Sequence, residues 1–183
     1  MNVIEAVEAV LAEAPEALYL ASLGTPAAAL RQVSGDGPHL YMGGAMGSAL
    51  AVALGLAEAR PDVPVVALLG DGELLMSANT LWSMAAIAPA NLLAVVLEDG
   101  LYYITGGQRL GSPTVFAAVA AALPALAASS ASTTAQLREE VRVSARPGLV
   151  AVRIDEQLKP EPSPFVDPAL VRVRFAERLE PLG

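Results

Sequence analysis

Short runs of uninterrupted apolar residues alternate with Ala-rich stretches along most of this chain. The runs at 64–69 and 92–97 contain no polar residue that would mark a solvent-facing side. Such continuous runs are typical of parallel strands that are covered on both faces. The repeated strand–helix order therefore predicts an α/β fold, a doubly wound and mostly parallel sheet with helices on both faces. We expect strands at 17–22, 40–42, 64–69, 92–97, near 125 and at 149–154, and helices at 2–14, 26–33, 46–60, 74–88, 114–123 and 133–145.

The chain has 183 residues, a length that suits one domain with a large core. We assign residues 1–158 to this domain. The composition changes at 159, where the Pro-rich stretch KPEPSPFVDP precedes a segment that alternates apolar and charged residues. We expect residues 159–183 to form a tail that packs on a partner subunit or over the active site.

Charge and residue usage exclude several functions. The chain carries 11 basic and 19 acidic residues, and the basic ones do not cluster, so we expect no nucleic-acid partner. It has no Cys and one His, which excludes thiolate zinc sites, cysteine nucleophiles and multi-histidine metal sites; the lack of Cys also fits a reducing, cytoplasmic location. The uncharged stretches 40–57, 74–97 and 110–137 are interrupted by Gly, Asn or Pro, so we expect no membrane span.

Acidic residues follow two consecutive predicted strands. Gly70-Asp71-Gly72-Glu73 comes after the strand 64–69, and Glu98-Asp99-Gly100 comes after the strand 92–97. Neighbouring parallel strands lie about 5 Å apart, so the two aspartates can share one divalent cation, for which carboxylate oxygens are suitable ligands. The turn at 70–73, between the strand 64–69 and the helix that follows it, also suits an anion such as a diphosphate. The alternative is that an Asp-Gly turn before a helix is ordinary loop chemistry.

Further motifs give these residues a family context. LGTPAAAL at 23–30, YMGGAMGSA at 41–49, GDGELLM at 70–76 and VVLEDGLYYITGGQ at 95–108 follow in this order. With the Glu98-Asp99 pair, they resemble the diphosphate-binding (PP) domain of thiamine diphosphate enzymes. The similarity is greatest to the β-subunit type of sulfopyruvate and phosphonopyruvate decarboxylases and extends over about residues 18–155.

The resemblance implies a cofactor site for thiamine diphosphate and Mg²⁺. The metal ligands would be the carboxylates of Asp71 and Asp99 and the backbone carbonyl of Leu101. Met46 would wedge beneath the cofactor, and the carbonyl of Gly44 would accept a hydrogen bond from its 4′-amino group. The remaining cofactor-binding residues would be Gly24, Thr25, Gly70, Gly72, Glu73 and Tyr102.

The glycine-rich loop after Asp99 would cover the reacting centre. The resemblance places Thr105 and Gln108 there as catalytic residues. Arg109 is the only basic residue between 61 and 137, and it would attract a sulfonate or phosphonate substrate. The alternative for Arg109 is an exposed loop cation.

Two residues depart from the family pattern. Asp99 stands where the family has an Asn and makes the metal cluster more negative. Glu73 stands where many decarboxylases have Ser, and we expect its side chain to point away from the diphosphate, which it would repel.

The resemblance covers only one of the two domains that these enzymes need. In the family, the Glu that activates the cofactor belongs to a separate pyrimidine-binding (PYR) domain. We therefore predict a PYR subunit as partner, in a hetero-oligomer such as α2β2 or larger. The predicted activity is decarboxylation of a small 2-oxo acid by a thiamine diphosphate-dependent lyase. Two alternatives stay open, namely a carboligase subunit of the acetolactate synthase type and a non-catalytic scaffold with the PP fold.

Overall fold

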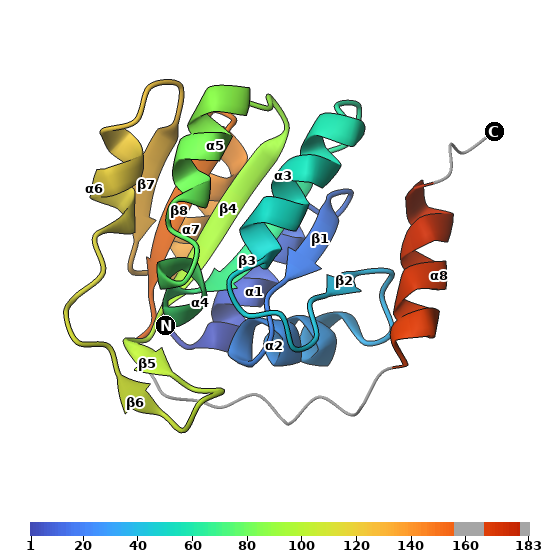
Figure 1. The fold of residues 1–183 in the computed structure, drawn as a ribbon, viewed down its shortest axis with the longest axis horizontal. Coiled ribbons are helices and arrows are strands. Elements are labelled where there is room, and N and C mark those ends of the chain that lie inside the picture. Colours follow the sequence, from blue (N-terminus) through green and yellow to red (C-terminus); the bar gives the residue numbers. More distant parts are fainter. Residues whose placement is uncertain (156–166, 180–183) are drawn as a thin grey trace.

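A computed structural model describes residues 1–155 and 167–179. Its centre is a six-stranded sheet in the order β2-β1-β3-β4-β8-β7, and every pair in it is parallel (Figure 1). The strands are β1 (Leu18–Ala21), β2 (Leu40–Tyr41), β3 (Val65–Gly70), β4 (Leu92–Glu98), β7 (Ala127–Ala131) and β8 (Gly148–Arg153). The predicted fold class is confirmed.

Helices cover both faces of the sheet and enclose two separate cores (Figure 1). One face is covered by α1 (Val3–Glu13), α2 (Thr25–Ser34) and α7 (Thr134–Val143). The other is covered by α3 (Ala49–Ala59), α4 (Asp71–Leu75), α5 (Thr80–Ile87) and α6 (Phe116–Ala121). Because β3 and β4 bury side chains toward both layers, their sequences are continuously apolar.

Two helices begin or break at places that differ from the prediction. The helix expected over 46–60 begins only at Ala49, because Gly47 has a φ of +91°, which a helix does not allow. The single helix expected over 74–88 is two helices, and the first already begins at Asp71. Between them the backbone forms tight turns in which the amides of Ser77 and Thr80 each donate to the carbonyl three residues earlier.

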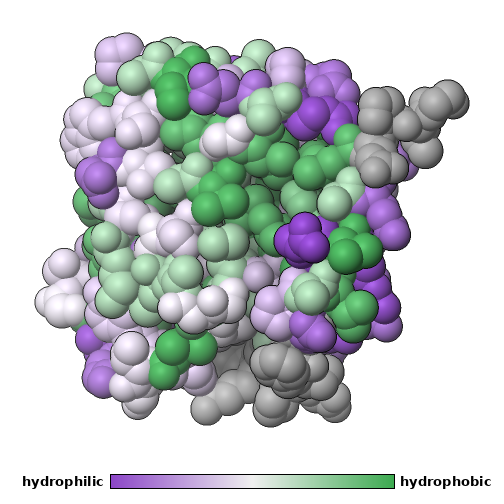
Figure 2. Space-filling view, turned by 45° about the vertical axis from the view of Figure 1, so that its right-hand side comes forward, coloured by the Kyte–Doolittle hydropathy of each residue, from purple (hydrophilic) through white to green (hydrophobic). Residues whose placement is uncertain are grey.

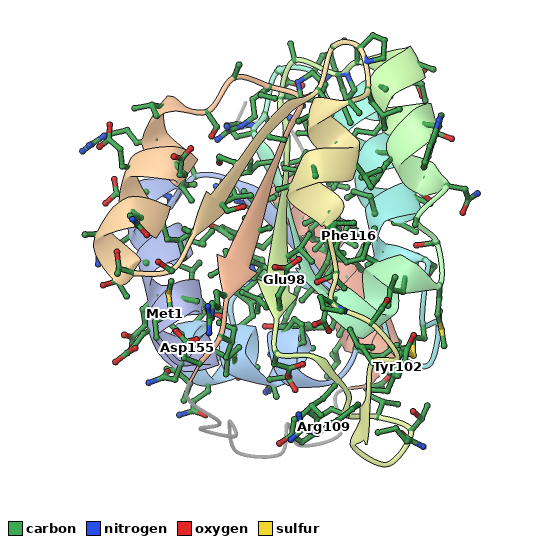
Figure 3. All side chains as sticks on the ribbon, turned by 90° about the vertical axis from the view of Figure 1, so that its left-hand side faces the viewer. Met1, Glu98, Tyr102, Arg109, Phe116 and Asp155 are labelled. Carbon is green, nitrogen blue, oxygen red and sulfur yellow. The ribbon has the colours of Figure 1, made fainter. Side chains whose placement is uncertain are left out.

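The glycine-rich loop after Asp99 contains a small antiparallel hairpin. Its strands are β5 (Leu101–Tyr102) and β6 (Gln108–Arg109). Gly106 and Gly107 both have positive φ, which allows the tight return between the strands. The hairpin projects beyond the carboxyl ends of the sheet strands (Figure 3).

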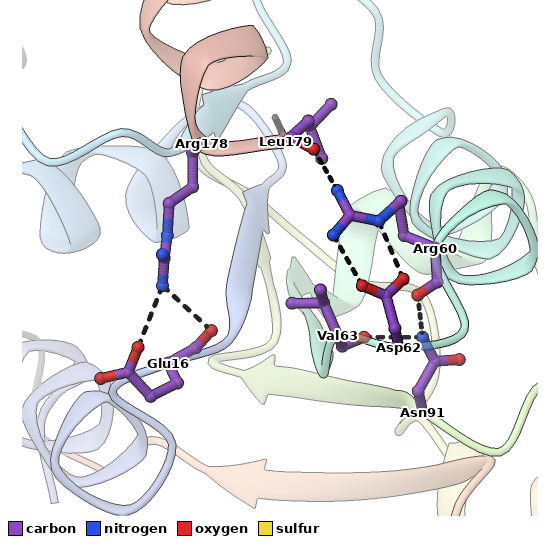
Figure 4. Close-up of polar contacts among 7 residues, drawn as sticks. All are labelled: Glu16, Arg60, Asp62, Val63, Asn91, Arg178 and Leu179. Atoms are coloured by element: carbon purple, nitrogen blue, oxygen red, sulfur yellow. Dashed lines mark hydrogen bonds and ion pairs between the residues drawn. The ribbon is translucent and has the colours of Figure 1, made fainter. Parts of the chain in front are cut away.

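The last described element is the helix α8 (Pro168–Leu179), which lies beside the edge strand β2. Phe175 is 6% exposed and joins the core on the α3 side of the sheet. Arg60 donates to the carbonyl of Leu179, and Arg178 pairs with the carboxylate of Glu16 at 3.2 Å (Figure 4). This helix therefore packs on its own chain. The predicted contact of the tail with a partner or the active site is untested, and residues 159–166 and 180–183 lie outside the described part.

The outer face of α3, α4 and α5 is apolar. It exposes 37% of Val52, 41% of Leu75, 56% of Met76, 55% of Trp82 and 45% of Ile87. Figure 2 shows hydrophobic side chains gathered across the middle of the side that carries α3. Among residues 1–155 and 167–179, no helix combines the length and the apolar character needed to cross a bilayer.

Candidate functional site

A pocket lies where the direction of the chain through the sheet reverses. The chain passes from β1 outward to β2 and then returns to β3 on the other side of β1, so the carboxyl ends of β1 and β3 border a crevice. Such switch points are where parallel sheets bind ligands. The pocket is open to solvent and has about 700 Å³ of empty space when the solvent at its mouth is included, and its lining includes the turns after β1, β3 and β4.

Asp71 is the most buried acid of the pocket, with 2% of its surface exposed. Its Oδ1 accepts from the amide of Gly72 at 2.7 Å, and its Oδ2 accepts from the amide of Gly100 at 2.8 Å. Burial raises the pKa of Asp71 to about 6; the negative charges of Asp99 and Glu98 act in the same direction, and the two amides oppose them. A bound cation would relieve this unfavourable charge.

Asp99 follows β4, next to the end of β3, and lines the same pocket. Its Oδ1 accepts from the amide of Leu101 at 3.0 Å, and burial raises its pKa. Glu98 turns elsewhere, because its Oε1 accepts from the hydroxyl of Thr114 at 2.8 Å. Of the acids that directly follow β3 and β4, Asp71 and Asp99 therefore line the pocket, and Glu73 of α4 lines it as well.

The backbone approaches closely around Gly72. A Cβ at this position would lie 2.6 Å from Cδ1 of Tyr102 and 3.5 Å from the carbonyl oxygen of Leu101. The Leu101 carbonyl therefore faces the Gly70–Gly72 turn, where it can join the two carboxylates as a third oxygen donor. No group of three or more His, Asp or Glu side chains suited to a metal ion exists in the described ranges, so further ligands would have to be carbonyls, water or a ligand's own oxygens.

The hairpin forms one side of the pocket. Ile104 lines it and reaches the turn after β1, since a Cβ at Gly24 would lie 2.9 Å from Cγ1 of Ile104. Gly24 has a φ of +81° and precedes α2 without a side-chain cap, so the N-terminus of α2 faces the pocket. A helix N-terminus favours an anion there.

The structure brings most of the predicted cofactor and metal residues together. Those that line the pocket are Gly24, Thr25, Met46, Gly70, Asp71, Gly72, Glu73, Asp99 and Leu101. Two predicted residues do not line the pocket. The ring of Tyr102 packs against Gly72, and Gly44 is exposed with a φ of +74°. The cofactor and metal roles of all these residues stay predictions.

The predicted catalytic residues lie on the hairpin, outside the pocket lining. The hydroxyl of Thr105 donates to Oε1 of Gln108 at 3.0 Å, and Nε2 of Gln108 donates to the Thr105 carbonyl at 2.8 Å. Both are exposed, as is Arg109, which lies opposite Leu101 in the hairpin, beyond the ends of the sheet strands (Figure 3). Their catalytic roles stay predictions. These roles require a substrate to bind next to the hairpin, outside the pocket lining described above.

Several lining residues were not foreseen from the sequence. Val3 comes from the start of α1, Ile154 follows β8, and Ile104 belongs to the hairpin. Only Ile104 lies in a segment that the sequence marks as functional, the glycine-rich loop. The others are ordinary apolar residues, and only their position at the carboxyl end of the sheet brings them to the pocket.

Comparison with protein families identifies the fold and its cofactor. Residues 24–153 match the model of the thiamine pyrophosphate enzyme C-terminal TPP binding domain, thiamine pyrophosphate being another name for thiamine diphosphate. The chain belongs to this family. The matched range contains the turns after β3 and β4 and the last residue of the turn after β1, and so most of the pocket.

Several curated relatives are decarboxylases by name. Phosphonopyruvate decarboxylase of Streptomyces viridochromogenes is 44% identical over 121 residues, which cover 65% of this chain and 30% of that protein. Sulfopyruvate decarboxylase subunit beta of Methanothermobacter thermautotrophicus is 38% identical over 105 residues, which cover 57% of this chain and 56% of that subunit. The aligned part thus spans about a third to just over half of these relatives.

Solved structures share the fold. Benzoylformate decarboxylase from Polynucleobacter necessarius superposes with a TM-score of 0.69 at 20% identity, over 85% of this chain and 33% of the other. The 4-hydroxybenzoylformate decarboxylase from Rhodococcus jostii gives 0.67 at 22% identity, over 84% and 32%. At this identity the likeness concerns the fold alone.

Proposed function

We propose that this chain is the thiamine diphosphate- and Mg²⁺-binding subunit of a 2-oxo acid decarboxylase that works with a separate PYR subunit. The observation that carries the proposal is the placement of Asp71 and Asp99 at the ends of neighbouring strands in the switch-point pocket. Bound there, thiamine diphosphate would supply a nucleophilic carbon for the 2-oxo carbonyl and a cationic thiazolium ring that takes up the electron pair released when carbon dioxide leaves.

The donor set around Asp71 fits Mg²⁺. Two carboxylates and the Leu101 carbonyl are hard oxygen ligands, and burial raises the pKa of both acids, so a cation is the missing counter-charge. The N-terminus of α2 faces the same pocket and suits the diphosphate. This chain's residues would therefore bind the metal and the diphosphate, and Met46 would form a wall beneath the rest of the cofactor.

The exposed apolar face supports a partner subunit. Val52, Trp82 and Ile87 are each more than a third exposed, although they are large and apolar. Monomeric proteins seldom leave such a face open, whereas subunit interfaces bury one. A relative is named as a subunit beta, which fits a hetero-oligomer, and we propose a cytoplasmic location on the lack of cysteine.

The names of the relatives suggest a 2-oxo acid with a second anionic group, a phosphonate or a sulfonate. Arg109, exposed on β6, is the cation that we propose to meet this group once the hairpin and the partner enclose the site. Arg109→Ala should then raise the KM for phosphonopyruvate or sulfopyruvate much more than the KM for pyruvate. An equal effect on all three would contradict this role.

The test of the proposed function is reconstitution. The chain is co-expressed with a candidate PYR subunit, and carbon dioxide release is followed with phosphonopyruvate, sulfopyruvate and pyruvate, with and without thiamine diphosphate and Mg²⁺. We expect turnover only with both subunits and both cofactors. Full activity of the purified chain alone would contradict the two-subunit proposal, and condensation of two substrates without net aldehyde release would favour the carboligase alternative.

A further inference from the structure

Glu73 is a buried acid of the pocket to which the proposed function gives no task. Its surface is 4% exposed. Its carboxylate reaches a segment that lies more than 20 residues away in sequence, where it accepts from the amide of Gly47 at 2.6 Å and from the amide of Ala49 at 3.1 Å. Both of its oxygens are thus engaged by the start of α3.

The start of α3 lacks a cap of its own. Ser48, the N-cap residue, has near-helical angles of φ −102° and ψ −15° and makes no capping bond. Its hydroxyl donates instead to the carbonyl of Ala45 at 2.6 Å. The first amides of a helix have no partner within it, and the helix dipole favours a negative charge there. The carboxylate of Glu73, which belongs to α4, therefore caps the start of α3.

The segment held in this way carries a wall of the pocket. Met46 lines the pocket directly before Gly47. The backbone around it is rich in glycine, the residue with the widest choice of backbone angles, because Gly43 and Gly44 precede it and Gly47 follows with a φ of +91°. Contacts from α4 and the turn after it hold the segment. They include the hydrogen bonds to Glu73 and the close approach of Gly47 to Met76, whose Cβ would lie 3.2 Å from a Cβ at Gly47.

We infer that Glu73 is a positioning residue that holds Met46 in the wall of the cofactor pocket by binding the amides of Gly47 and Ala49. It acts through Met46, and its charge is directed to the start of α3. This explains how an acid is accommodated beside a diphosphate site. The inference deepens the proposed function and rests on it for the identity of the cofactor.

The first test measures amide hydrogen exchange in the full chain without cofactor. In Glu73→Gln, the side-chain oxygen can accept from one amide, but its NH2 group faces the other donor. We expect the amides of Gly47 and Ala49 to exchange at least about tenfold faster than in the unmodified chain, with no change in α1. The matched control is Glu5→Gln, which removes the capping carboxylate of Glu5 that accepts from the Asn2 amide at 3.0 Å and should affect only α1.

The second test measures thiamine diphosphate affinity in the presence of Mg²⁺ by titration calorimetry. We expect about tenfold weaker binding in Glu73→Gln and no change in Glu5→Gln, because a loosened wall must be ordered on binding. Faster exchange with unchanged affinity would show a structural cap only and overturn the inference. Unchanged exchange would overturn it directly.

These readouts separate the inference from the proposed function. If the unmodified chain binds no thiamine diphosphate, the proposed function fails, whereas the exchange rates still decide whether Glu73 holds the Met46 segment. If Glu73→Gln does not fold, the unmodified chain and Glu73→Asp replace it. Absence of protection at Gly47 and Ala49 in the unmodified chain would then contradict the inference.

Discussion

We expect His39, the one histidine of the chain, to stay neutral at pH values well below those at which a histidine side chain usually takes up a proton. Its ring meets the ring of Tyr19 edge-on at a centroid distance of 5.4 Å and that of Tyr41 at 6.3 Å. Burial, and secondly the positive charge of Arg178 on α8, lower its pKa from 6.5 to about 4. Protonating this side chain in the folded protein is therefore unfavourable.

The sign of the effect on stability follows from this lowered pKa. The unfolded chain takes up the proton near pH 6.5, but the folded chain does so only near pH 4. The stabilisation is complete above pH 6.5 and is lost as the pH falls toward 4. The difference corresponds to about 3 kcal/mol in total, of which about 2 kcal/mol are lost between pH 8 and pH 5.

The assay compares the unmodified chain with His39→Phe by urea unfolding at pH 8, 6.5 and 5. Phenylalanine keeps an aromatic ring between Tyr19 and Tyr41 but binds no proton. All other titrating groups, including Asp71, are present in both chains and largely cancel in the difference. We expect the variant to gain about 2 kcal/mol relative to the unmodified chain from pH 8 to pH 5.

A proton NMR titration of the single histidine ring gives an independent measure. We expect a midpoint near pH 4. A midpoint near 6.5, or a stability difference that does not change with pH, would refute the argument that burial against Tyr19 and Tyr41 keeps this ring neutral.

Three further predictions concern the site and the apolar face. Asp71→Ala should weaken Mg²⁺-dependent binding of thiamine diphosphate at least about 100-fold in calorimetry, since metal ligation by carboxylate is lost; retained affinity would contradict the metal site. Gly72→Ala should destabilise the chain by about 1–3 kcal/mol in urea unfolding, because the new methyl group meets the Tyr102 ring, and Tyr102→Ala in the same chain should recover part of the loss. Trp82→Glu should change the stability of the isolated chain by less than about 1 kcal/mol, because the side chain is 55% exposed, but should reduce co-purification with the PYR subunit; unchanged co-purification would exclude this face from the interface.

Much of the sheet could be predicted because its signal is local. The apolar runs at 64–69 and 92–97 became β3 and β4 with ends shifted by one residue at most. The parallel register then brings Gly70 opposite Leu97, which places Asp71 and Asp99 at one edge, as expected from their spacing. Periodicity and strand order together therefore locate the site.

Features that depend on turn geometry or on contacts distant in the sequence could not be predicted. The two-residue strands β5 and β6 exist because of a register set by the turn at Gly106 and Gly107. The segment of α8 alternates apolar and charged residues like a strand, yet it is a helix, packed through Phe175 and Arg178. The sequence led us to expect that Glu73 points away from the diphosphate. It could not show which groups bind the carboxylate, because Gly47 and Ala49 are far away in sequence.

The position of α8 also limits how copies of this protein can assemble. An open sheet edge offers unpaired backbone groups to which a strand of another molecule can add. Here the edge strand β2 contains only two residues, and α8 lies against it. Growth of the sheet from one molecule into the next is therefore hindered at β2, and association on this side of the molecule would use side-chain surfaces such as the apolar face of α3 to α5.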